Sequence, residues 1–172
     1  DVAKELGFTG YANGENKFGP DQKFKRAEAL KIIQTAFQET YIEGTDYCND
    51  VTPFADVMMQ HWAVQRLCWA KQNHRITGYK NTGILERFFP EKMITNAEFA
   101  AMLLRNTKEA ESLDKIYRQN LADNKPWYNG YWNYVLDNKL SKNINANKIL
   151  TRAEALDMLY LFHEKKLLPK AS

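Results

Sequence analysis

Two arginines that open identical pentapeptides have the residue type and position to bind an acid. The sequence Arg-Ala-Glu-Ala-Leu begins at Arg26 and recurs unchanged at Arg152. A guanidinium at the start of a helix offers paired donors to a carboxylate, beside amides and a dipole that favour negative charge. A third, divergent copy has Asn96 there, which keeps hydrogen bonding but loses the charge. We therefore expect Arg26 and Arg152 to bind an acidic ligand and the Asn96 site to be weak; surface pairing with a neighbouring acid is the alternative.

The glutamate two residues after each of these positions could serve as a general acid. A glycoside hydrolase needs two carboxylates about 5–10 Å apart. Glu28, Glu98 and Glu154 belong to separate copies that we expect to lie far from each other. We therefore interpret them as structural residues and expect no enzymatic activity.

A capping box explains these glutamates better. Thr95 and Thr151 stand three residues before Glu98 and Glu154, so each threonine hydroxyl can accept an orphan amide while the glutamate reaches back to the amide of the cap. The first copy has Lys25 at this position, where its side chain cannot accept a hydrogen bond and the positive end of the helix repels it. A role other than helix stability is expected for this lysine.

Histidine and cysteine form no catalytic or metal-binding pattern. His61, His74 and His163 lack ligand spacing, and a nucleophilic pair of Cys68 with a nearby histidine has no third orienting group. Cys48 and Cys68 are 20 positions apart, which matches no zinc or redox signature. They are either unlinked core thiols of a cytosolic protein or, if the chain is exported, a disulfide. No metal and no cofactor are expected.

Composition describes an ordinary soluble domain rich in aromatic side chains. The chain has 172 residues, 44% of them hydrophobic and 26% charged, and its 24 Lys and Arg against 21 Asp and Glu give a net charge of +3. That charge is too small and dispersed for an electrostatic nucleic-acid footprint. No apolar run reaches the roughly 18 residues of a membrane span. We expect one domain, without nucleic-acid binding or membrane insertion.

Helical periodicity positions the capped segments. Apolar residues four and five positions after each glutamate predict helices with one buried face, starting at about Lys25, Thr95 and Thr151. A second helical stretch lies upstream of the later two copies, beginning near Trp62 and Trp127. Both tryptophans are expected mainly to pack in the core, with contact to a ligand as the alternative.

The ordered set of motifs resembles the S-layer homology (SLH) family. After the tryptophan-bearing helix comes a glycine-tyrosine loop, then an aromatic-proline pair, then the capped helix. The strongest block in this order is Phe54-Ala55-Asp56-Val57, Trp62, Gly78-Tyr79, Phe89-Pro90 and Ile94-Thr95-Asn96-Ala97-Glu98.

This resemblance implies an all-α fold of three SLH-type helix-loop-helix repeats in a pseudo-threefold arrangement around a central helical bundle. We expect a single domain over 1–172, with repeats at 1–44, 45–116 and 117–172. The first repeat is too short to hold its tryptophan-bearing helix before Gly10. Either an upstream piece is missing, or another protein chain or a tail supplies that helix.

The resemblance also implies non-covalent anchoring to a cell surface by an acidic, pyruvylated-type secondary cell-wall polysaccharide bound in grooves between repeats. Such a location is extracellular, where Cys48 and Cys68 would be joined. The alternative is an SLH-type protein-protein assembly module of a surface layer or extracellular complex. The expected ligand-binding residues are Arg26, Arg152, Asn96, Lys25, Tyr11, Tyr79 and Trp127.

Overall fold

The chain folds into α-helices joined by long irregular segments. The computed structural model describes residues 19–79 and 86–168, which contain helices and isolated bridges but no strand or sheet. The prediction of an all-α fold is therefore confirmed. The glycine-tyrosine loop at Tyr11 and the shortened start of the first expected repeat lie outside the described residues. The helices are α2 (Arg26–Ala36), α3 (Val64–Gln72), α4 (Asn96–Leu104), α5 (Ala110–Ala122), α6 (Asn129–Asp137) and α7 (Arg152–Glu164).

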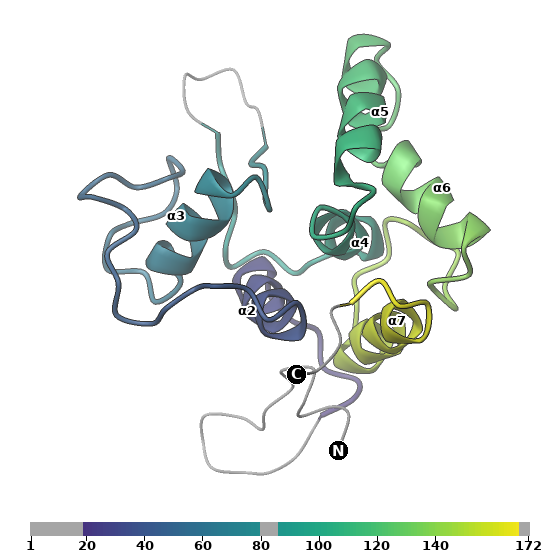
Figure 1. Ribbon diagram of the computed structural model, residues 1–172, viewed down its shortest axis with the longest axis horizontal. Coiled ribbons are helices and arrows are strands. Elements are labelled where there is room, and N and C mark those ends of the chain that lie inside the picture. The colour runs from purple at the N-terminus through teal and green to yellow at the C-terminus, as the bar shows by residue number, and fades with distance from the viewer. Residues whose placement is uncertain (1–18, 80–85, 169–172) are drawn as a thin grey trace.

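Helices α2, α4 and α7 lie around the centre of the molecule, with α3 on one side and α5 and α6 on the other (Figure 1). The N-cap positions of these three helices are occupied by Lys25, Thr95 and Thr151. The Thr95 hydroxyl accepts from the Glu98 amide at 3.3 Å, and the Glu98 carboxylate accepts from the Thr95 amide at 2.9 Å. Thr151 and Glu154 repeat this arrangement, at 3.3 and 3.0 Å. Each box satisfies amides that the helix geometry leaves unpaired.

The segments that precede the three helices are connected by a ring of backbone hydrogen bonds. The first two amides of each helix donate to carbonyls of the segment that leads into another of the three helices. Within the ring, Phe24, Ile94 and Leu150 are buried. The donor-acceptor pairs are Arg26 to Lys92, Ala27 to Pro90, Asn96 to Lys148, Ala97 to Ala146, Arg152 to Gln22 and Ala153 to Pro20, at 2.8–3.1 Å.

The upstream helices α3 and α6 bury one face each, as their periodicity predicts. Leu67 and Ala70 of α3 are buried, as is Val135 of α6. The core placement predicted for Trp62 is wrong, because this side chain is 54% exposed. Helix α3 begins only at Val64, so Trp62 lies in the preceding turn and is not on the buried face of the helix.

Helix α5 was not predicted from the repeat pattern. It runs for 13 residues and packs against α6. Residues 116 and 117, the expected junction of the second and third repeats, both lie within this helix. Its inner side brings Tyr117 and Leu121 to a cavity at the centre of the candidate site.

Cys48 and Cys68 form a disulfide, with their Cα atoms 5.3 Å apart. The disulfide prediction is therefore confirmed, and Cys68 has no free thiol for nucleophilic chemistry. The bond ties the irregular segment before α3 to that helix. Disulfides are typical of oxidising compartments. None of the six helices described combines the length and apolar character that a membrane crossing needs.

Candidate functional site

The candidate site is a cavity of about 580 Å³, which we name the Arg26 cavity. It is formed where the start of α2 meets the loop at Gly78 and Tyr79, one face of α4, the last turns of α5 and the segment before α6. Two of the expected ligand-binding residues other than Arg26 thus come together here, from distant parts of the chain. Its charged and large aromatic lining residues are Arg26, Tyr79, Glu98, Arg105, Tyr117 and Trp127.

Arg26 is a buried cation, only 4% exposed, and not a solvated surface arginine. Its Nε donates to the Phe88 carbonyl oxygen at 2.8 Å, and its Nη1 lies 3.6 Å from a carboxylate oxygen of Glu98. The guanidinium stacks 4.5 Å from the centre of the Phe88 ring and 4.9 Å from that of Tyr79. Burial lowers the pKa of Arg26, while the Glu98 charge opposes that shift. Arginine remains protonated in proteins, so a fixed positive charge lines this cavity.

Glu98 serves two cations as well as its helix cap. Its side chain is 5% exposed, and Lys92 Nζ lies 3.1 Å from the same oxygen that faces Arg26. Burial, and then the charge of Arg26, lower the pKa of Lys92. Arg26 and Lys92 therefore share one buried carboxylate at this end of the cavity, and the charge of Asp56 also acts on Arg26.

Aromatic rings form the walls. Tyr79 is held by two backbone hydrogen bonds to Arg87, at 2.7 and 3.1 Å. A side chain at the adjacent Gly78 would bring its Cβ within 2.9 Å of the Arg87 carbonyl oxygen, so the turn requires glycine. Across the cavity, Trp127 lies edge-on to Tyr117 with ring centres 6.3 Å apart. Rings in such positions can pack on the apolar faces of a sugar.

Asn96 occupies the place in α4 that Arg26 has in α2, but it is closed off from solvent. It is 1% exposed, and its Nδ2 donates to the Asn145 carbonyl oxygen at 2.8 Å. The neighbouring cavity, here named the Glu154 cavity, has only about 270 Å³. Hydrogen bonds from Lys148 and from the Thr151 backbone lower the pKa of Glu154, although burial alone would raise it. The lining residues are Ser141, Lys142, Asn143, Ile144, Glu154 and Asp157.

Among the described residues, Arg152 and Lys25 do not line the Arg26 cavity. Arg152 begins α7, and its amide donates to the Gln22 carbonyl oxygen at 2.8 Å. Lys25 forms an ion pair with Glu91, which also accepts a 3.0 Å hydrogen bond from His61 when that ring is protonated on Nε2. The Lys25 side chain caps nothing, and the Lys25 amide instead donates to the Glu28 carboxylate at 2.7 Å.

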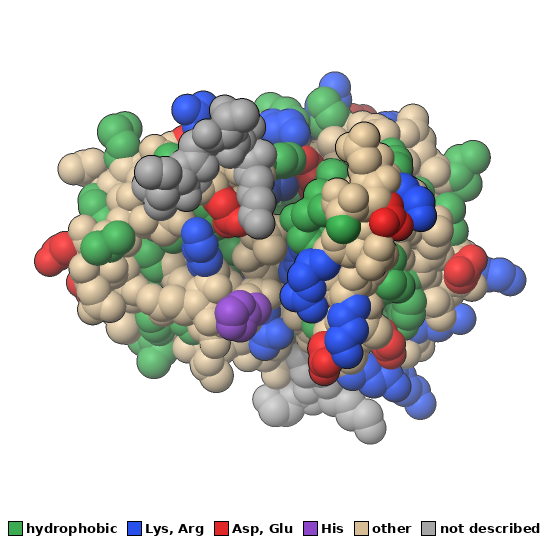
Figure 2. Space-filling view, turned by 90° about the horizontal axis from the view of Figure 1, so that it is seen from above, with side chains coloured by type: hydrophobic (Ala, Val, Ile, Leu, Met, Phe, Trp, Pro, Cys, Tyr) green, Lys and Arg blue, Asp and Glu red, His purple; other side chains and the backbone are tan. Residues whose placement is uncertain are grey.

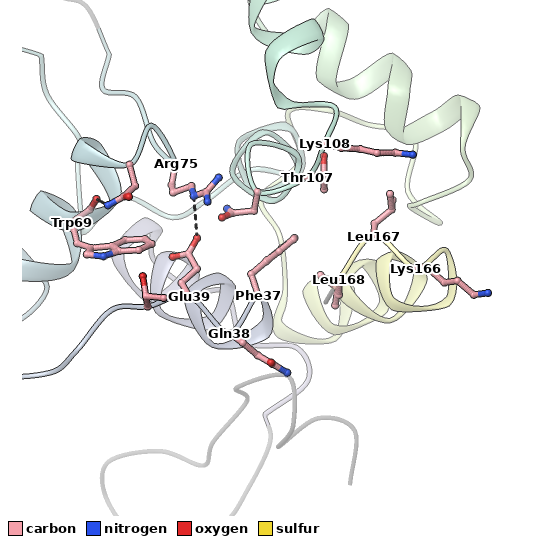
Figure 3. A pocket seen from close by; sticks show the side chains of 13 residues that line it. Phe37, Gln38, Glu39, Trp69, Arg75, Thr107, Lys108, Lys166, Leu167 and Leu168 are labelled. Atoms are coloured by element: carbon pink, nitrogen blue, oxygen red, sulfur yellow. Dashed lines mark hydrogen bonds and ion pairs between the residues drawn. The ribbon is translucent and has the colours of Figure 1, made fainter. Parts of the chain in front are cut away.

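A second cavity of about 540 Å³ lies at the C-terminal ends of α2, α3, α4 and α7, and the sequence pattern did not indicate it (Figure 3). Glu39, whose side chain is 4% exposed, faces Arg75 with 3.6 Å between carboxylate oxygen and Nε. Burial raises the pKa of Glu39 to about 7 against the opposing charge of Arg75. Figure 3 shows Lys166 directed away from this pair. The guanidinium of Arg75, whose side chain is 36% exposed, thus already faces a carboxylate of the protein in this cavity.

In the segments 19–79 and 86–168, no group of three or more His, Cys, Asp or Glu side chains is arranged to hold a metal ion. The carboxylates of Glu28, Glu98 and Glu154 each accept the amide of their own helix cap. No known family model matches the chain, and no curated protein matches it in sequence. Its function must therefore be inferred from its own side chains.

Proposed function

We propose that this protein is a non-covalent cell-surface anchoring module of the SLH type, with three repeats around a pseudo-threefold centre. The ring of hydrogen bonds between the segments before α2, α4 and α7 supports this arrangement. The ligand is an acidic secondary cell-wall polysaccharide of the pyruvylated type, bound in grooves between repeats. The Arg26 cavity is the principal site, and the protein acts by binding, without catalysis.

One observation carries this proposal: a buried, held guanidinium lines a cavity with aromatic walls. Because Nε is engaged by Phe88, the orientation of the guanidinium of Arg26 is set before a ligand arrives. The terminal nitrogens can then receive a carboxylate in charge-assisted hydrogen bonds. Tyr79 and Trp127 provide apolar surface for the sugar ring that carries this carboxylate.

The disulfide supports an extracellular location. Cys48 and Cys68 would be kept reduced in most cytosolic environments. The surface charge also fits a glycan better than a nucleic acid. On the face seen in Figure 2, Lys and Arg side chains alternate with Asp and Glu and form no continuous basic surface.

Calorimetric titration with purified pyruvylated wall polysaccharide tests the proposal. Replacing Arg26 with alanine should weaken binding by about 1.5–3 kcal/mol, because a charge-assisted contact is lost. Lysine at this position should rescue poorly, since it keeps the charge without the planar pair of donors. The matched control is Arg118→Ala, an exposed arginine on α5, which should bind as the unaltered protein does.

The ligand supplies a second control. Polysaccharide from which the pyruvate has been removed by mild acid should bind Arg26→Ala and the unaltered protein equally weakly. Circular dichroism confirms that each variant is folded. Unchanged affinity of folded Arg26→Ala for the intact polymer would contradict the proposal.

Exposed apolar side chains favour a second candidate function, that of a protein-protein assembly module. Within the segment 42–62, Ile42, Val51, Met58 and Trp62 are 54–74% exposed. Large exposed apolar patches mark interaction sites in many proteins. Sedimentation over a range of concentrations should then show an oligomer that Met58→Ser with Trp62→Ser dissociates, whereas a monomer throughout argues against assembly.

A further inference from the structure

Arg105 is a second buried arginine whose hydrogen bonding is incomplete. It caps the C-terminal end of α4, is 4% exposed and lines the Arg26 cavity. Its Nε donates to Asp114 at 3.3 Å, but its Nη2 is buried without a hydrogen-bond partner. A buried guanidinium nitrogen without an acceptor is costly, so an acceptor is expected there.

The surroundings hold this guanidinium in place. Its central carbon lies 5.0 Å from the ring centre of Tyr131 and 5.5 Å from that of Tyr117. Asp114, its carboxylate partner, also accepts a hydrogen bond from the Tyr131 hydroxyl. Asp114 thus accepts from two donors, and its contact with Arg105 Nε leaves the Nη2 of Arg105 without an acceptor.

Helix geometry sets the spacing along α4 between Arg105 and Glu98, the carboxylate that faces Arg26. Arg26 faces Glu98 at the start of α4, and Arg105 follows Glu98 by seven residues. Seven residues are about two helical turns, a rise of about 10 Å, and return to nearly the same face. Between them the cavity floor is made by Ala101 and Met102. A ligand in contact with both arginines therefore lies along this face of α4.

We propose that the Arg26 cavity recognises a glycan segment with carboxylates on two neighbouring sugar units, one at Arg26 and the other at Arg105. This inference rests on the proposed function and specifies its ligand. The two guanidiniums repel each other, since the charge of Arg105 helps to lower the pKa of Arg26. A ligand with two carboxylates reduces this repulsion and supplies an acceptor to the Nη2 of Arg105, whereas a ligand with one carboxylate at Arg26 leaves that nitrogen without one.

The Glu154 cavity lacks this second arginine. Leu161 stands seven positions after Glu154, where Arg105 stands relative to Glu98. Asp157 stands three positions after Glu154 and carries a carboxylate. Asp157 lines that cavity and forms an ion pair with Lys142 at 2.8 Å. Recognition of two acids is therefore a property of the Arg26 cavity.

The test compares galacturonic acid with digalacturonic acid, which carries a carboxylate on each of two linked rings, by calorimetry at low salt. The unaltered protein should bind the diacid about tenfold more tightly than the monoacid, since one more charge-assisted contact forms. In Arg105→Gln this ratio should fall to about one. Arg118→Gln, at an exposed position on α5, should keep the full ratio.

Each outcome decides the inference. A full ratio in folded Arg105→Gln overturns it, and so does equal binding of both acids by the unaltered protein, although the proposed function then stands. If neither acid binds, the inference is overturned, and the proposed function is judged separately with the wall polysaccharide. If Arg105→Gln fails to fold, the two monomethyl esters of digalacturonic acid decide with the unaltered protein. Either ester binding as tightly as the diacid overturns the inference.

Discussion

The Arg26 cavity and the Glu154 cavity share one backbone plan but differ in the side chains that could contact a ligand. In both, a side-chain nitrogen at the first position of a helix donates to a loop carbonyl, from Arg26 to Phe88 and from Asn96 to Asn145. In both, a lysine pairs with the capping glutamate. The volumes, however, are about 580 and 270 Å³.

The features that both cavities share can be assigned to the fold, and those found only in the Arg26 cavity to the proposed binding. The carbonyl contact and the capping carboxylate are present in both places, so they belong to the scaffold. The guanidinium, the aromatic walls and the small Ala101 belong to the Arg26 cavity alone; no aromatic side chain is among the described residues that line the Glu154 cavity. In the proposed function, these few side chains decide which of the two cavities holds an acid.

The largest expected effect compares the two capping glutamates by their contribution to stability. Glu98→Gln should lower the free energy of unfolding by about 3–5 kcal/mol, because it leaves the buried Arg26 without its carboxylate. Glu154→Gln should cost no more than about 1 kcal/mol, since its partner Lys148 is half-exposed. Urea unfolding measures both. Equal losses would mean that the two cavities are electrostatically alike.

The pH dependence of stability includes a contribution from Glu39, which lies in the cavity at the C-terminal ends of the helices. Its pKa is raised from 4.5 to about 7, so the unfolded chain loses this proton first as the pH rises. The free energy of unfolding should therefore fall by about 3 kcal/mol between these pH values and level off above pH 7. The difference between the unfolding curves of the unaltered protein and Glu39→Gln isolates this contribution. A difference that is independent of pH would contradict the raised pKa.

A smaller effect is expected from rebuilding the weak site. Asn96→Arg alone should add no binding, because Asp157, paired with Lys142 at 2.8 Å, still lines a cavity of only about 270 Å³. Asn96→Arg combined with Asp157→Ala restores the arginine and the small side chain of the Arg26 cavity. It should raise the calorimetric stoichiometry for wall polysaccharide by one site, about tenfold weaker than the first because the aromatic walls are missing. Asp157→Ala alone is the control. A second site in Asn96→Arg alone would show that Asp157 does not decide the difference.

Local signals in the sequence were enough to predict the starts of the central helices. A capping box involves only four consecutive residues, so Thr95 and Glu98 reveal their helix without tertiary information. The disulfide was predictable only in combination with the location that the SLH resemblance implies, because the spacing of Cys48 and Cys68 matches no signature.

Long-range packing decided what the sequence could not show. Trp62 fits the periodicity of a buried face, yet the helix begins after it and the side chain is exposed. Arg105 follows the apolar residues of α4 and carries no motif, so its burial depends on α5 and α6 folding over it. The amphipathic pattern of α5 was readable in the sequence, but it lay across the expected repeat junction.

The ring of backbone hydrogen bonds has a consequence for how the protein comes apart. In a linear array of repeats, each unit contacts only its neighbours, and a terminal unit can fray while the others remain folded. Here the start of α2 donates to the segment before α4, the start of α4 donates to the segment before α7, and the start of α7 donates to the segment before α2. Such a circle has no terminal unit. Loss of any one segment removes acceptors from a helix start elsewhere, so the three segments should unfold together.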